Sequence, residues 1–277
     1  MKYRLILLLC AILCTSQLVT AQQKGHYAAI NGLQLYYEIH GSGSPLVLIH
    51  GGGSTIESSF GRVLPELAKT HQVIAVEMQA HGHTRDIDRE MTFEQDADDI
   101  AALLQQLHIA KADILGFSNG GTTSLQVAIR HPEVVNKLIL CSTLYSRAGT
   151  PPGFFDGFAH ATLDVMPKEL KTAYLKTNPD PKGLQAMFNR DVARMKAFKD
   201  IPEAAIKAIQ APALVINGAA ELILPEHALA LSRTLSHGQL AIFPGGHGEY
   251  MGEAGAPDKS SKEPEAFLIV VNEFLGK

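Results

Sequence analysis

The sequence predicts an α/β fold in which a mostly parallel sheet is covered by helices on both faces. The first observation is a series of apolar runs that are too short for helices and suit strands buried on both faces of a parallel sheet. The second is that stretches with helical periodicity separate these runs. The third is the composition, because 46% of the 277 residues are hydrophobic and only 3 are cysteine, which excludes disordered chains and disulfide-stapled miniproteins.

Length and charge narrow the class further. A chain of 277 residues can bury a full-sized core and fits one large domain or a domain with a sizeable insertion. With 24 basic and 28 acidic residues, the chain has a net charge of −4 and provides no broad basic surface for nucleic acid. We therefore expect its partner to be a small molecule.

Residues 1–21 are predicted to be a secretory signal peptide. Lys2 and Arg4 precede an apolar run, and Ala21 ends the small-x-small pattern at which such signals are cleaved. The alternative, a membrane anchor, needs about 20 continuous apolar residues, and the polar residues at 15–17 interrupt the run too early. We therefore expect export of residues 22–277 to the periplasm or the medium, with no membrane attachment once the signal is removed.

Loss of this segment would change the cysteine content and the charge. Cys10 and Cys14 lie within it, so the mature chain keeps Cys141 alone and can form no internal disulfide. Two basic residues are lost as well, which leaves 22 basic and 28 acidic residues and a net charge of −6. The exported protein is thus expected to be more acidic than its precursor.

The mature chain opens with a predicted hairpin and continues with predicted parallel strands. The runs His26–Ile30 and Leu33–Ile39 flank Asn31-Gly32, a pair that supplies the positive φ angles of a tight two-residue turn. The later runs are expected to be buried strands, the last of them included: 46–49, 72–76, 112–115, 137–141, 213–216 and 240–243.

Helices are predicted between these strands. Residues 92–107 open with Thr92 as a cap and have apolar side chains at helical spacing. A second helix is expected to start near Gly121, and an apolar-faced helix over 263–275 closes the chain.

The alternation is interrupted at about 144–210, where some seventy residues contain no strand-like run. This segment is rich in Met, Phe, Lys and Pro. Its Phe and Met side chains could form a small helical core, or they could line an apolar substrate pocket in a helical cap laid over the carboxyl edge of the sheet. The two interpretations are compatible, so we expect a helical cap insertion in a domain that spans 22–277.

A candidate nucleophile, Ser118, follows the predicted strand at 112–115 directly. It lies in Gly116-Phe117-Ser118-Asn119-Gly120, the Gly-x-Ser-x-Gly pattern of a sharp strand-to-helix turn. Glycines on both sides suit such a turn because the backbone is strained and closely packed there. A glycine-rich turn with an ordinary serine is the alternative, and the flanking strand and helix disfavour it.

A glycine-rich loop, His50-Gly51-Gly52-Gly53, follows the predicted strand at 46–49. Three glycines leave backbone N–H groups unshielded, as the stabilisation of an oxyanion requires. A phosphate-binding loop would need a Gly-Lys-Ser/Thr sequence, which the chain lacks.

His247 is the candidate general base among the twelve histidines. It follows the last predicted strand on a loop rich in glycine, which would allow its ring to reach the serine hydroxyl. His81 and His83 form a His-Gly-His pair, but no acidic or histidine partner at ligand spacing accompanies them. We therefore predict no metal site.

The acid that orients the base should follow a strand and precede His247 in the chain. Glu221 is the first carboxylate after the predicted strand at 213–216. Glu226, at the start of a predicted helix, and Glu249, after the base, are the competitors, and Glu221 could also be a solvated loop residue.

Taken together, the sequence resembles the α/β-hydrolase superfamily over nearly the whole mature chain. The likeness rests on His50-Gly51-Gly52-Gly53, Glu77 to Thr84, Gly116 to Gly121, Gly218 to Pro225 and Pro244 to His247. Two of these segments depart from the family pattern, which usually has Asp where this chain has Glu221 and Asp where it has Glu77.

The resemblance implies an eight-stranded, mostly parallel sheet with Ser118, Glu221 and His247 as the triad. It also implies an oxyanion hole formed by the N–H groups of Gly52 and Asn119. We therefore predict a serine hydrolase that cleaves a small carboxylic ester through an acyl-serine intermediate, with no cofactor. Lactonase, peptidase, carbon–carbon bond hydrolase and perhydrolase activities are alternatives on the same triad, and a non-catalytic ligand-binding protein is a rival of another class.

Overall fold

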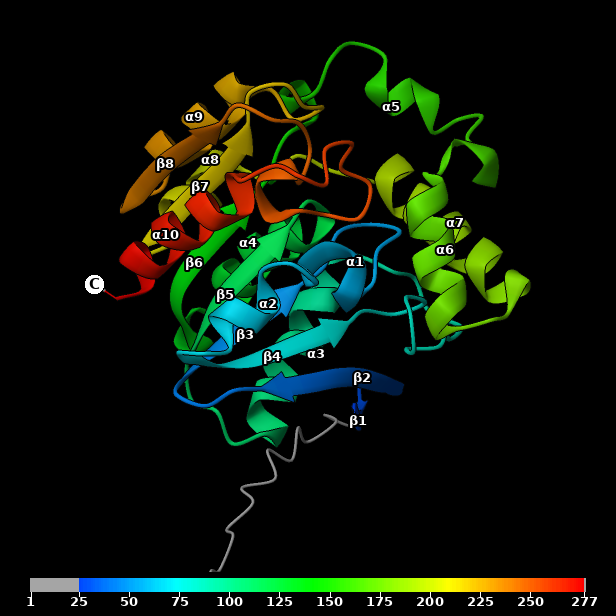
Figure 1. Ribbon diagram of the computed structural model, residues 1–277, viewed down its shortest axis with the longest axis horizontal. Coiled ribbons are helices and arrows are strands. Elements are labelled where there is room, and N and C mark those ends of the chain that lie inside the picture. Colours follow the sequence, from blue (N-terminus) through cyan, green and yellow to red (C-terminus); the bar gives the residue numbers. More distant parts are fainter. Residues whose placement is uncertain (1–24, 277) are drawn as a thin grey trace, which may run out of the picture.

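The computed structural model describes residues 25–276, which form an eight-stranded sheet with helices on both faces (Figure 1). The predicted signal peptide lies outside the described residues. Over 25–276, no helix has both the length and the apolar character needed to cross a membrane. The strands are β1 (His26–Ile30), β2 (Leu33–His40), β3 (Ser44–Ile49), β4 (His71–Glu77), β5 (Ala112–Phe117), β6 (Val135–Cys141), β7 (Ala213–Gly218) and β8 (Gly238–Phe243).

The helices alternate with the strands after β3, as the sequence predicts. They are α1 (Ile56–Phe60), α2 (Leu64–Leu67), α3 (Phe93–Gln106), α4 (Asn119–Arg130), α5 (Phe154–Gly157), α6 (Lys168–Thr177), α7 (Pro181–Lys196), α8 (Glu203–Lys207), α9 (Pro225–Thr234) and α10 (Glu263–Leu275). Thr92 caps α3 by accepting the Gln95 N–H, which confirms the predicted start of that helix. The helix expected near Gly121 begins two residues earlier, at Asn119.

The strand order β1-β2-β4-β3-β5-β6-β7-β8 brings the loops after β3 and β5 together. β1, β2 and β4 pair antiparallel, and the remaining pairs are parallel. From β3 the chain runs to β4 on one side and later to β5 on the other, so the order reverses at β3. Ligand sites of open α/β sheets lie at such a reversal, outside the carboxyl ends of the strands.

Two apolar cores hold the helices against the sheet. Helices α3, α4, α8 and α9 pack on one face, where Ile100, Leu125 and Leu231 are fully buried. Helices α1, α2 and α10 pack on the other face through Phe60, Phe267 and related side chains. The central strands are therefore covered on both sides, which explains their continuous apolar sequences.

The hairpin expected at the N-terminus is confirmed. Ile30 pairs with Leu33 across the turn, and Asn31 and Gly32 have φ angles of 47° and 88°. Both angles are positive, as a tight two-residue hairpin turn requires.

The expectation that the last strand is buried is wrong. β8 is the edge of the sheet, and Leu240 and Ile242 are 36% and 42% exposed. Only Phe243 at the carboxyl end of the strand is buried. An edge strand has one neighbour, here β7, so its apolar residues can remain in contact with solvent.

The segment between β6 and β7 is helical, as expected, and we name it the insertion. Figure 1 shows its helices α5, α6 and α7 beyond the end of the sheet, away from the helices that cover the two faces. Its aromatic and Met side chains form two small clusters. One contains Met166, Tyr174 and Met187, and the other contains Met195, Phe198 and the partly buried Phe154.

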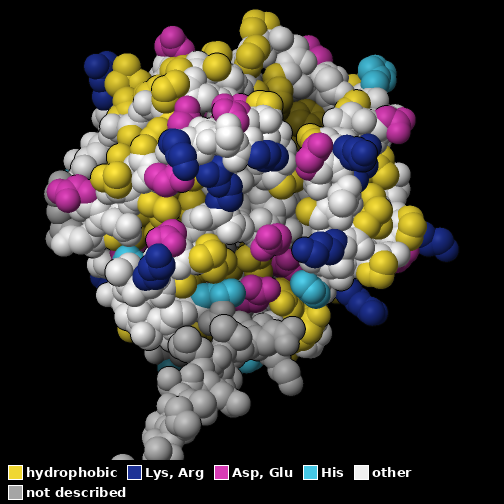
Figure 2. All heavy atoms as spheres, viewed as in Figure 1, with side chains coloured by type: hydrophobic (Ala, Val, Ile, Leu, Met, Phe, Trp, Pro, Cys, Tyr) yellow, Lys and Arg dark blue, Asp and Glu magenta, His cyan; other side chains and the backbone are white. Residues whose placement is uncertain are grey.

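The face seen in Figure 2 has no broad region of one charge. Lys, Arg, Asp and Glu side chains are interspersed on it with apolar ones. Such a mixed surface gives no large electrostatic field of one sign on this face.

Candidate active site

Ser118 lies at the strained turn between β5 and α4. Its φ of 54° is positive, which non-glycine residues rarely adopt. The adjacent glycines are required by space: a Cβ on Gly116 would lie 2.1 Å from the Gly120 carbonyl oxygen, and one on Gly120 would lie 2.1 Å from the Ile49 carbonyl oxygen. The backbone therefore turns sharply enough to project the serine away from the sheet.

His247 and Glu221 form a direct pair. The ring Nδ1 of His247 lies 2.6 Å from Glu221 Oε2. The carboxylate side chain is fully buried, whereas the imidazole is 26% exposed. Glu221 therefore holds the ring through Nδ1 and leaves Nε2 without a carboxylate partner. The ring itself lines a pocket. Glu226, a competing acid, is exposed on α9.

Two further donors hold the Glu221 carboxylate. The Gly218 N–H and the Ser142 hydroxyl donate to Oε1 at 2.5 and 2.8 Å. The Tyr250 hydroxyl lies 2.6 Å from Ser142 Oγ, and burial raises the pKa of that phenol well above its usual value. Because Ser142 uses its proton on Glu221, Tyr250 donates to Ser142. The relay fixes the carboxylate geometry.

Sequence reasoning missed Ser142 and Tyr250. One signal was available, because Ser142 follows β6 directly and β6 pairs with β7, the strand that precedes Glu221. Register aligns the carboxyl ends of these two strands, with Cys141 opposite Ile216. A polar residue after β6 was therefore placed to reach Glu221.

The predicted oxyanion donors belong to two loops in close contact. A Cβ on Gly52 would lie 2.4 Å from Asn119 Nδ2, so a larger residue there would displace the Asn119 side chain. Asn119 is the first residue of α4, where the backbone N–H has no acceptor within the helix. The N-terminal end of a helix also favours negative charge. The site can therefore stabilise an oxyanion.

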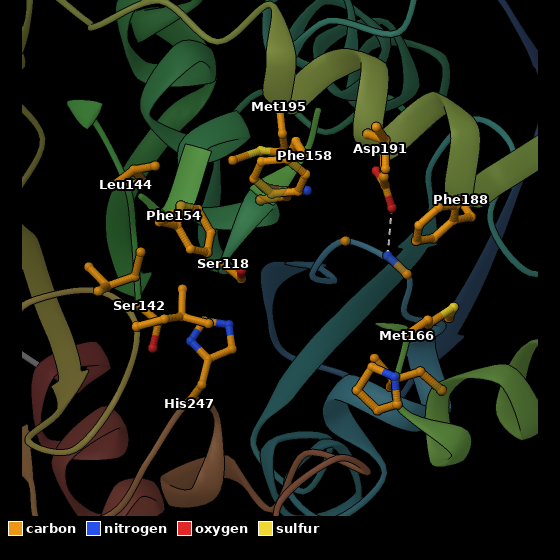
Figure 3. Close-up of a pocket in the computed structure, with 18 of the residues that line it drawn as sticks. Ser118, Ser142, Leu144, Phe154, Phe158, Met166, Phe188, Asp191, Met195 and His247 are labelled. Carbon is orange, nitrogen blue, oxygen red and sulfur yellow. Dashed lines mark hydrogen bonds between the residues drawn. The ribbon is translucent and has the colours of Figure 1, made fainter. Parts of the chain in front are cut away.

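Ser118, His247, Gly52 and Asn119 line one pocket of about 220 Å³ (Figure 3). The insertion supplies most of the remaining wall, which is apolar: Phe154, Phe158, Met166, Pro167, Leu170, Met187, Phe188, Val192 and Met195. Some of the insertion's Phe and Met side chains therefore form clusters, and some line this apolar pocket.

The serine and the histidine are not joined directly in the structure. Figure 3 shows Ser118 and His247 facing the same space, but the hydrogen bonds of residues 25–276 include none between the Ser118 hydroxyl and the His247 ring. In unliganded active sites this contact is often long and shortens when substrate binds.

Asp191, on α7, is a second carboxylate at this pocket, with its side chain 14% exposed, and sequence reasoning missed it. Its Oδ2 accepts the Gly53 N–H at 2.7 Å and lies 3.0 Å from His81 Nε2, and its Oδ1 accepts from Arg194 at 2.5 Å. Burial acts to raise its pKa, but the charges of His81 and Arg194 outweigh burial and lower it. No local pattern marks a residue on one helix as the partner of a loop 138 positions earlier.

The chain beyond Asp191 continues the buried network. Arg194 donates to Asp96 on α3 at 2.8 Å and lies over the Phe93 ring at 4.8 Å. Full burial raises the pKa of Asp96 to about 6, although Arg194 acts in the opposite direction. Asp191 and Asp96 thus share one guanidinium. Through Asp191 the insertion contacts the loop after β3, and through Arg194 it contacts α3.

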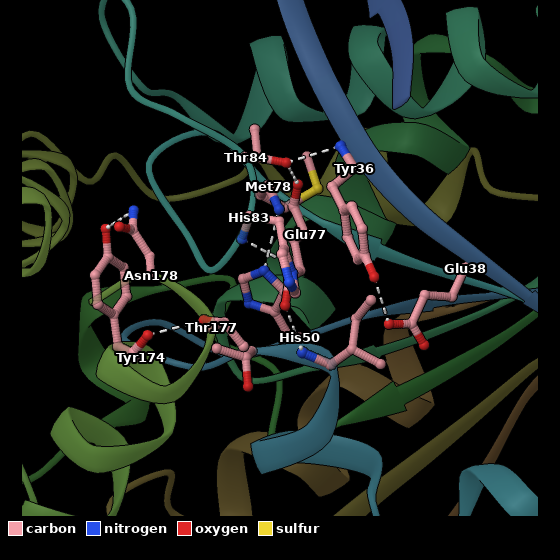
Figure 4. A network of polar contacts seen from close by, with 12 residues as sticks. Tyr36, Glu38, His50, Glu77, Met78, His83, Thr84, Tyr174, Thr177 and Asn178 are labelled. Atoms are coloured by element: carbon pink, nitrogen blue, oxygen red, sulfur yellow. Dashed lines mark hydrogen bonds and ion pairs between the residues drawn. The ribbon is translucent and has the colours of Figure 1, made fainter. Parts of the chain in front are cut away.

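The two histidines considered for a metal point to different partners. His81 is fully buried against Asp191, while His83 Nδ1 lies 2.8 Å from Glu77 Oε2 (Figure 4). Over residues 25–276, no three His, Cys, Asp or Glu side chains are grouped to hold a metal ion. Glu77, one of the departures from the family pattern, is buried and also accepts the backbone N–H of His83. It stabilises the turn rather than contributing to the pocket.

The chain is similar in sequence to known hydrolases over most of its length. A model of the alpha/beta hydrolase fold family matches residues 44–166. The 2-hydroxymuconate semialdehyde hydrolase of Pseudomonas sp. (strain CF600) is 31% identical over 235 residues, which cover 76% of this chain and 83% of that protein. Serine hydrolase BPHL of Homo sapiens is 29% identical over 87% of this chain and 84% of that protein. A pimeloyl-[acyl-carrier protein] methyl ester esterase of Neisseria meningitidis serogroup B (strain MC58) is also 29% identical, over 82% of this chain and 91% of that protein.

Solved structures show the same fold. A serine hydrolase involved in carbazole degradation (CarC enzyme) gives a TM-score of 0.74 at 23% identity, covering 92% of this chain and 99% of that one. The enol-lactonase from Burkholderia xenovorans LB400 gives 0.72 at 23% identity, covering 91% of this chain and 100% of that one.

Proposed function

The chain belongs to the alpha/beta hydrolase family, and we propose that it is a serine hydrolase that cleaves a small carboxylic ester. The observation that carries the proposal is the 2.6 Å pair of His247 and Glu221 beside a pocket that also exposes Ser118. A nucleophile, a base and an acid that orients the base then converge on one space. The pimeloyl ester relative supports ester chemistry, and the apolar pocket suits an apolar acyl or alcohol group.

In the acylation half of the proposed reaction, Ser118 is the nucleophile. His247 takes the hydroxyl proton through the ring nitrogen that Glu221 does not hold, and the serine oxygen attacks the ester carbonyl carbon. Glu221 stabilises the imidazolium that results. The N–H groups of Gly52 and Asn119 donate to the oxyanion. Collapse of this intermediate breaks the ester bond, and the imidazolium protonates the leaving alcohol.

In the deacylation half, water replaces the alcohol. His247 takes a proton from the water, the hydroxide attacks the acyl-serine carbonyl, and the same N–H groups hold the second oxyanion. Breakdown returns the proton to Ser118 and releases the carboxylic acid. No cofactor is needed for either half.

A second candidate is the hydrolysis of a carbon–carbon bond. It is favoured by the 31% identity to 2-hydroxymuconate semialdehyde hydrolase. The same serine, base and oxyanion donors can serve both reactions, so the choice depends on which substrate the pocket accepts.

The test of the proposal is the Ser118→Ala variant. We expect it to lose p-nitrophenyl acetate hydrolysis and labelling by a fluorophosphonate probe, because both require the serine nucleophile. Ser236→Ala, at an exposed serine whose hydroxyl donates to the Lys207 carbonyl, is the matched control and should retain both. Full labelling of Ser118→Ala would refute the proposal, and so would a wild-type protein that hydrolyses no ester and takes no label.

Export remains part of the proposal, carried by the sequence of residues 1–21. Expression of the full chain followed by fractionation and N-terminal sequencing tests it. We expect an exported protein that begins at Gln22, and a cytoplasmic protein that retains Lys2 would contradict it.

A further inference from the structure

We propose that Asp191 sets the charge preference of the pocket, so that it favours esters with a neutral or positively charged second group over esters with a free carboxylate. This inference rests on the proposed ester hydrolysis and adds a class of substrate to it. The triad alone would treat these esters alike. The insertion, through Asp191, would then select among them.

Asp191 is the one acidic side chain among the pocket-lining residues in the described part of the chain, and no Lys or Arg lines this pocket. Figure 3 shows its carboxylate at the pocket wall, bonded to the loop after β3. A Cβ on Gly52 would lie 3.3 Å from Asp191 Oδ2. The carboxylate therefore lies at the pocket wall beside the loop after β3.

The carboxylate keeps its negative charge at neutral pH. It accepts the Gly53 N–H and interacts with His81 and Arg194, and these charges lower its pKa despite burial. A substrate therefore meets a fixed carboxylate rather than a carboxylic acid. The other contacts bind it to the loop and leave 14% of the side chain exposed.

Neither of the two cations beside Asp191 is available to a substrate anion. His81 is fully buried, and only 4% of the Arg194 side chain is exposed, with its two terminal nitrogens donating to Asp191 and Asp96. His81 and Arg194 reduce the field of Asp191, but neither of them lines the pocket. The negative end of this ion pair is therefore the end nearer to the substrate.

A comparison of anionic with cationic substrates distinguishes the charge effect of Asp191 from the desolvation penalty that any charged group meets at an apolar wall. Either charge loses hydration in the pocket, so desolvation alone penalises an anion and a cation to a similar extent. Asp191 adds repulsion for the anion and attraction for the cation. A preference for the cation over the anion is thus the specific signature of Asp191.

The experiment compares three methyl esters of similar length: methyl heptanoate, monomethyl adipate and methyl 6-aminohexanoate. Their ends are neutral, negative and positive at pH 7, and each end is remote from the carbonyl, so their intrinsic reactivity is similar. For the wild-type protein we expect kcat/KM for the amino ester to exceed that for the adipate ester by at least about tenfold. Hydrolysis is followed by proton release in a pH-stat.

The Asp191→Asn variant should bring that ratio close to one or invert it, because Arg194 remains. A general loss of activity in this variant would lower all three rates, whereas a change in the ratio requires a change in charge recognition. Asp98→Asn removes an equal charge at the surface ion pair with Arg130 and should leave the ratio unchanged. Asp191→Ser serves as a second variant if Asp191→Asn does not fold.

Two results would overturn the inference: equal wild-type rates for the adipate and amino esters, or a ratio that persists in the Asp191 variants. Absence of hydrolysis for all three esters and for p-nitrophenyl acetate is a different outcome. It would refute the proposed function itself and remove the basis of the inference.

Discussion

Two histidine–carboxylate pairs flank the same pocket, one from each side. On the sheet side, His247 lies 2.6 Å from Glu221. On the insertion side, His81 lies 3.0 Å from Asp191. Each carboxylate also accepts a backbone N–H from a glycine, so the two pairs look alike when only the direct contacts are considered.

The pairs differ in what surrounds the histidine. The His247 side chain is 26% exposed and lines the pocket, and its Nδ1 alone is held by the acid. The His81 side chain is fully buried, with Nδ1 2.8 Å from the Gln79 carbonyl oxygen and Nε2 against Asp191. A ring with both nitrogens occupied cannot accept a proton from a nucleophile. Access to the second nitrogen, rather than the pair itself, marks the candidate base.

The two carboxylates, Asp191 and Glu221, differ in whether a permanently charged side chain contacts them. Arg194 gives Asp191 a permanent positive partner, whereas Glu221 is held by neutral donors, Ser142 and Gly218, besides His247. A carboxylate already paired with a guanidinium has less to gain from an imidazolium. In the proposed reaction Glu221 can therefore stabilise charge on its histidine, while Asp191 holds the loop after β3 through the Gly53 N–H.

The largest expected difference between the pairs is in catalysis. Glu221→Gln should lower kcat for p-nitrophenyl acetate by about 10³ to 10⁴-fold, because the amide neither orients the ring correctly nor stabilises the imidazolium. Asp191→Asn should lower it by no more than roughly tenfold for this neutral ester, because the amide oxygen can still accept the Gly53 N–H. Steady-state kinetics measures both.

Glu226→Gln, at an exposed acid on α9, is the control for Glu221 and should leave kcat unchanged. Equal losses in Glu221→Gln and Asp191→Asn would mean that the two pairs do not differ in function. Equal effects of Glu221→Gln and Glu226→Gln would mean that Glu221 is not the acid of the triad.

The next largest effect is on the free energy of unfolding and arises at Arg194, which pairs with Asp191 and Asp96. Arg194→Gln should reduce the free energy of unfolding by about 3 to 5 kcal/mol, because it leaves the buried Asp96 without a cation and Asp191 with His81 alone. Adding Asp191→Asn to Arg194→Gln should recover part of that loss, since one of the two charges is then absent. Urea unfolding of the two variants and the wild type measures this.

Arg130→Gln is the matched control, because Arg130 pairs with Asp98 at the surface. It should cost at most about 1 kcal/mol. A similar small loss for Arg194→Gln would show that the buried network contributes little.

Stability should also depend on pH through Asp96, the α3 residue that pairs with Arg194 of the insertion. Burial raises its pKa from 3.8 to about 6, so between about pH 4 and pH 6 the folded state binds a proton that the unfolded state has released. This contribution therefore lowers stability as the pH rises through that window, by up to about 3 kcal/mol in total.

The measurement is the free energy of unfolding of the wild type and of Asp96→Asn across pH 4 to 7. The difference between the two proteins should change in the window around pH 4 to 6 and stay constant above it. A difference that is flat over the whole range would rule out the raised pKa of Asp96.

The smallest expected effect tests the relay behind Glu221. Ser142→Ala removes one of three donors to this carboxylate, so kcat should fall by about tenfold with little change in KM. Tyr250→Phe acts one step further away and should have a smaller effect. Ser146→Ala, at a partly exposed serine that donates to Asp200, should leave kcat unchanged. An unchanged kcat in Ser142→Ala would show that His247 and Gly218 suffice to hold the acid.

Much of the fold could be predicted because its signals are local. The apolar runs of the central strands and the Asn31-Gly32 turn each depend on a few neighbouring residues, and the structure confirms them. Strand ends were less predictable: β4 extends to His71 and Glu77 because backbone pairing continues where the side chains are polar. The burial of β8 was wrong because the position of a strand within the sheet is not a local property.

The candidate site divides in the same way. The elbow at Ser118 and the loop at Gly52 are short motifs on one turn each, and their positions followed from the sequence. Asp191 contacts Gly53 across 138 residues, and Tyr250 contacts Ser142 across 108. These contacts depend on how the insertion and the last loop pack, which no nearby residue indicates.

The sequence by itself determined the sheet, the serine turn, the glycine loop and the order in which the proposed nucleophile, acid and base follow one another. Those features depend on backbone conformation and apolar periodicity, which a few consecutive residues specify. Only the tertiary structure decided that Glu221 meets His247, that His81 is fully buried, and that Asp191 places a fixed charge at the pocket wall. A side-chain contact between distant segments exists only when packing brings them together, and here that packing sets the chemistry of the pocket.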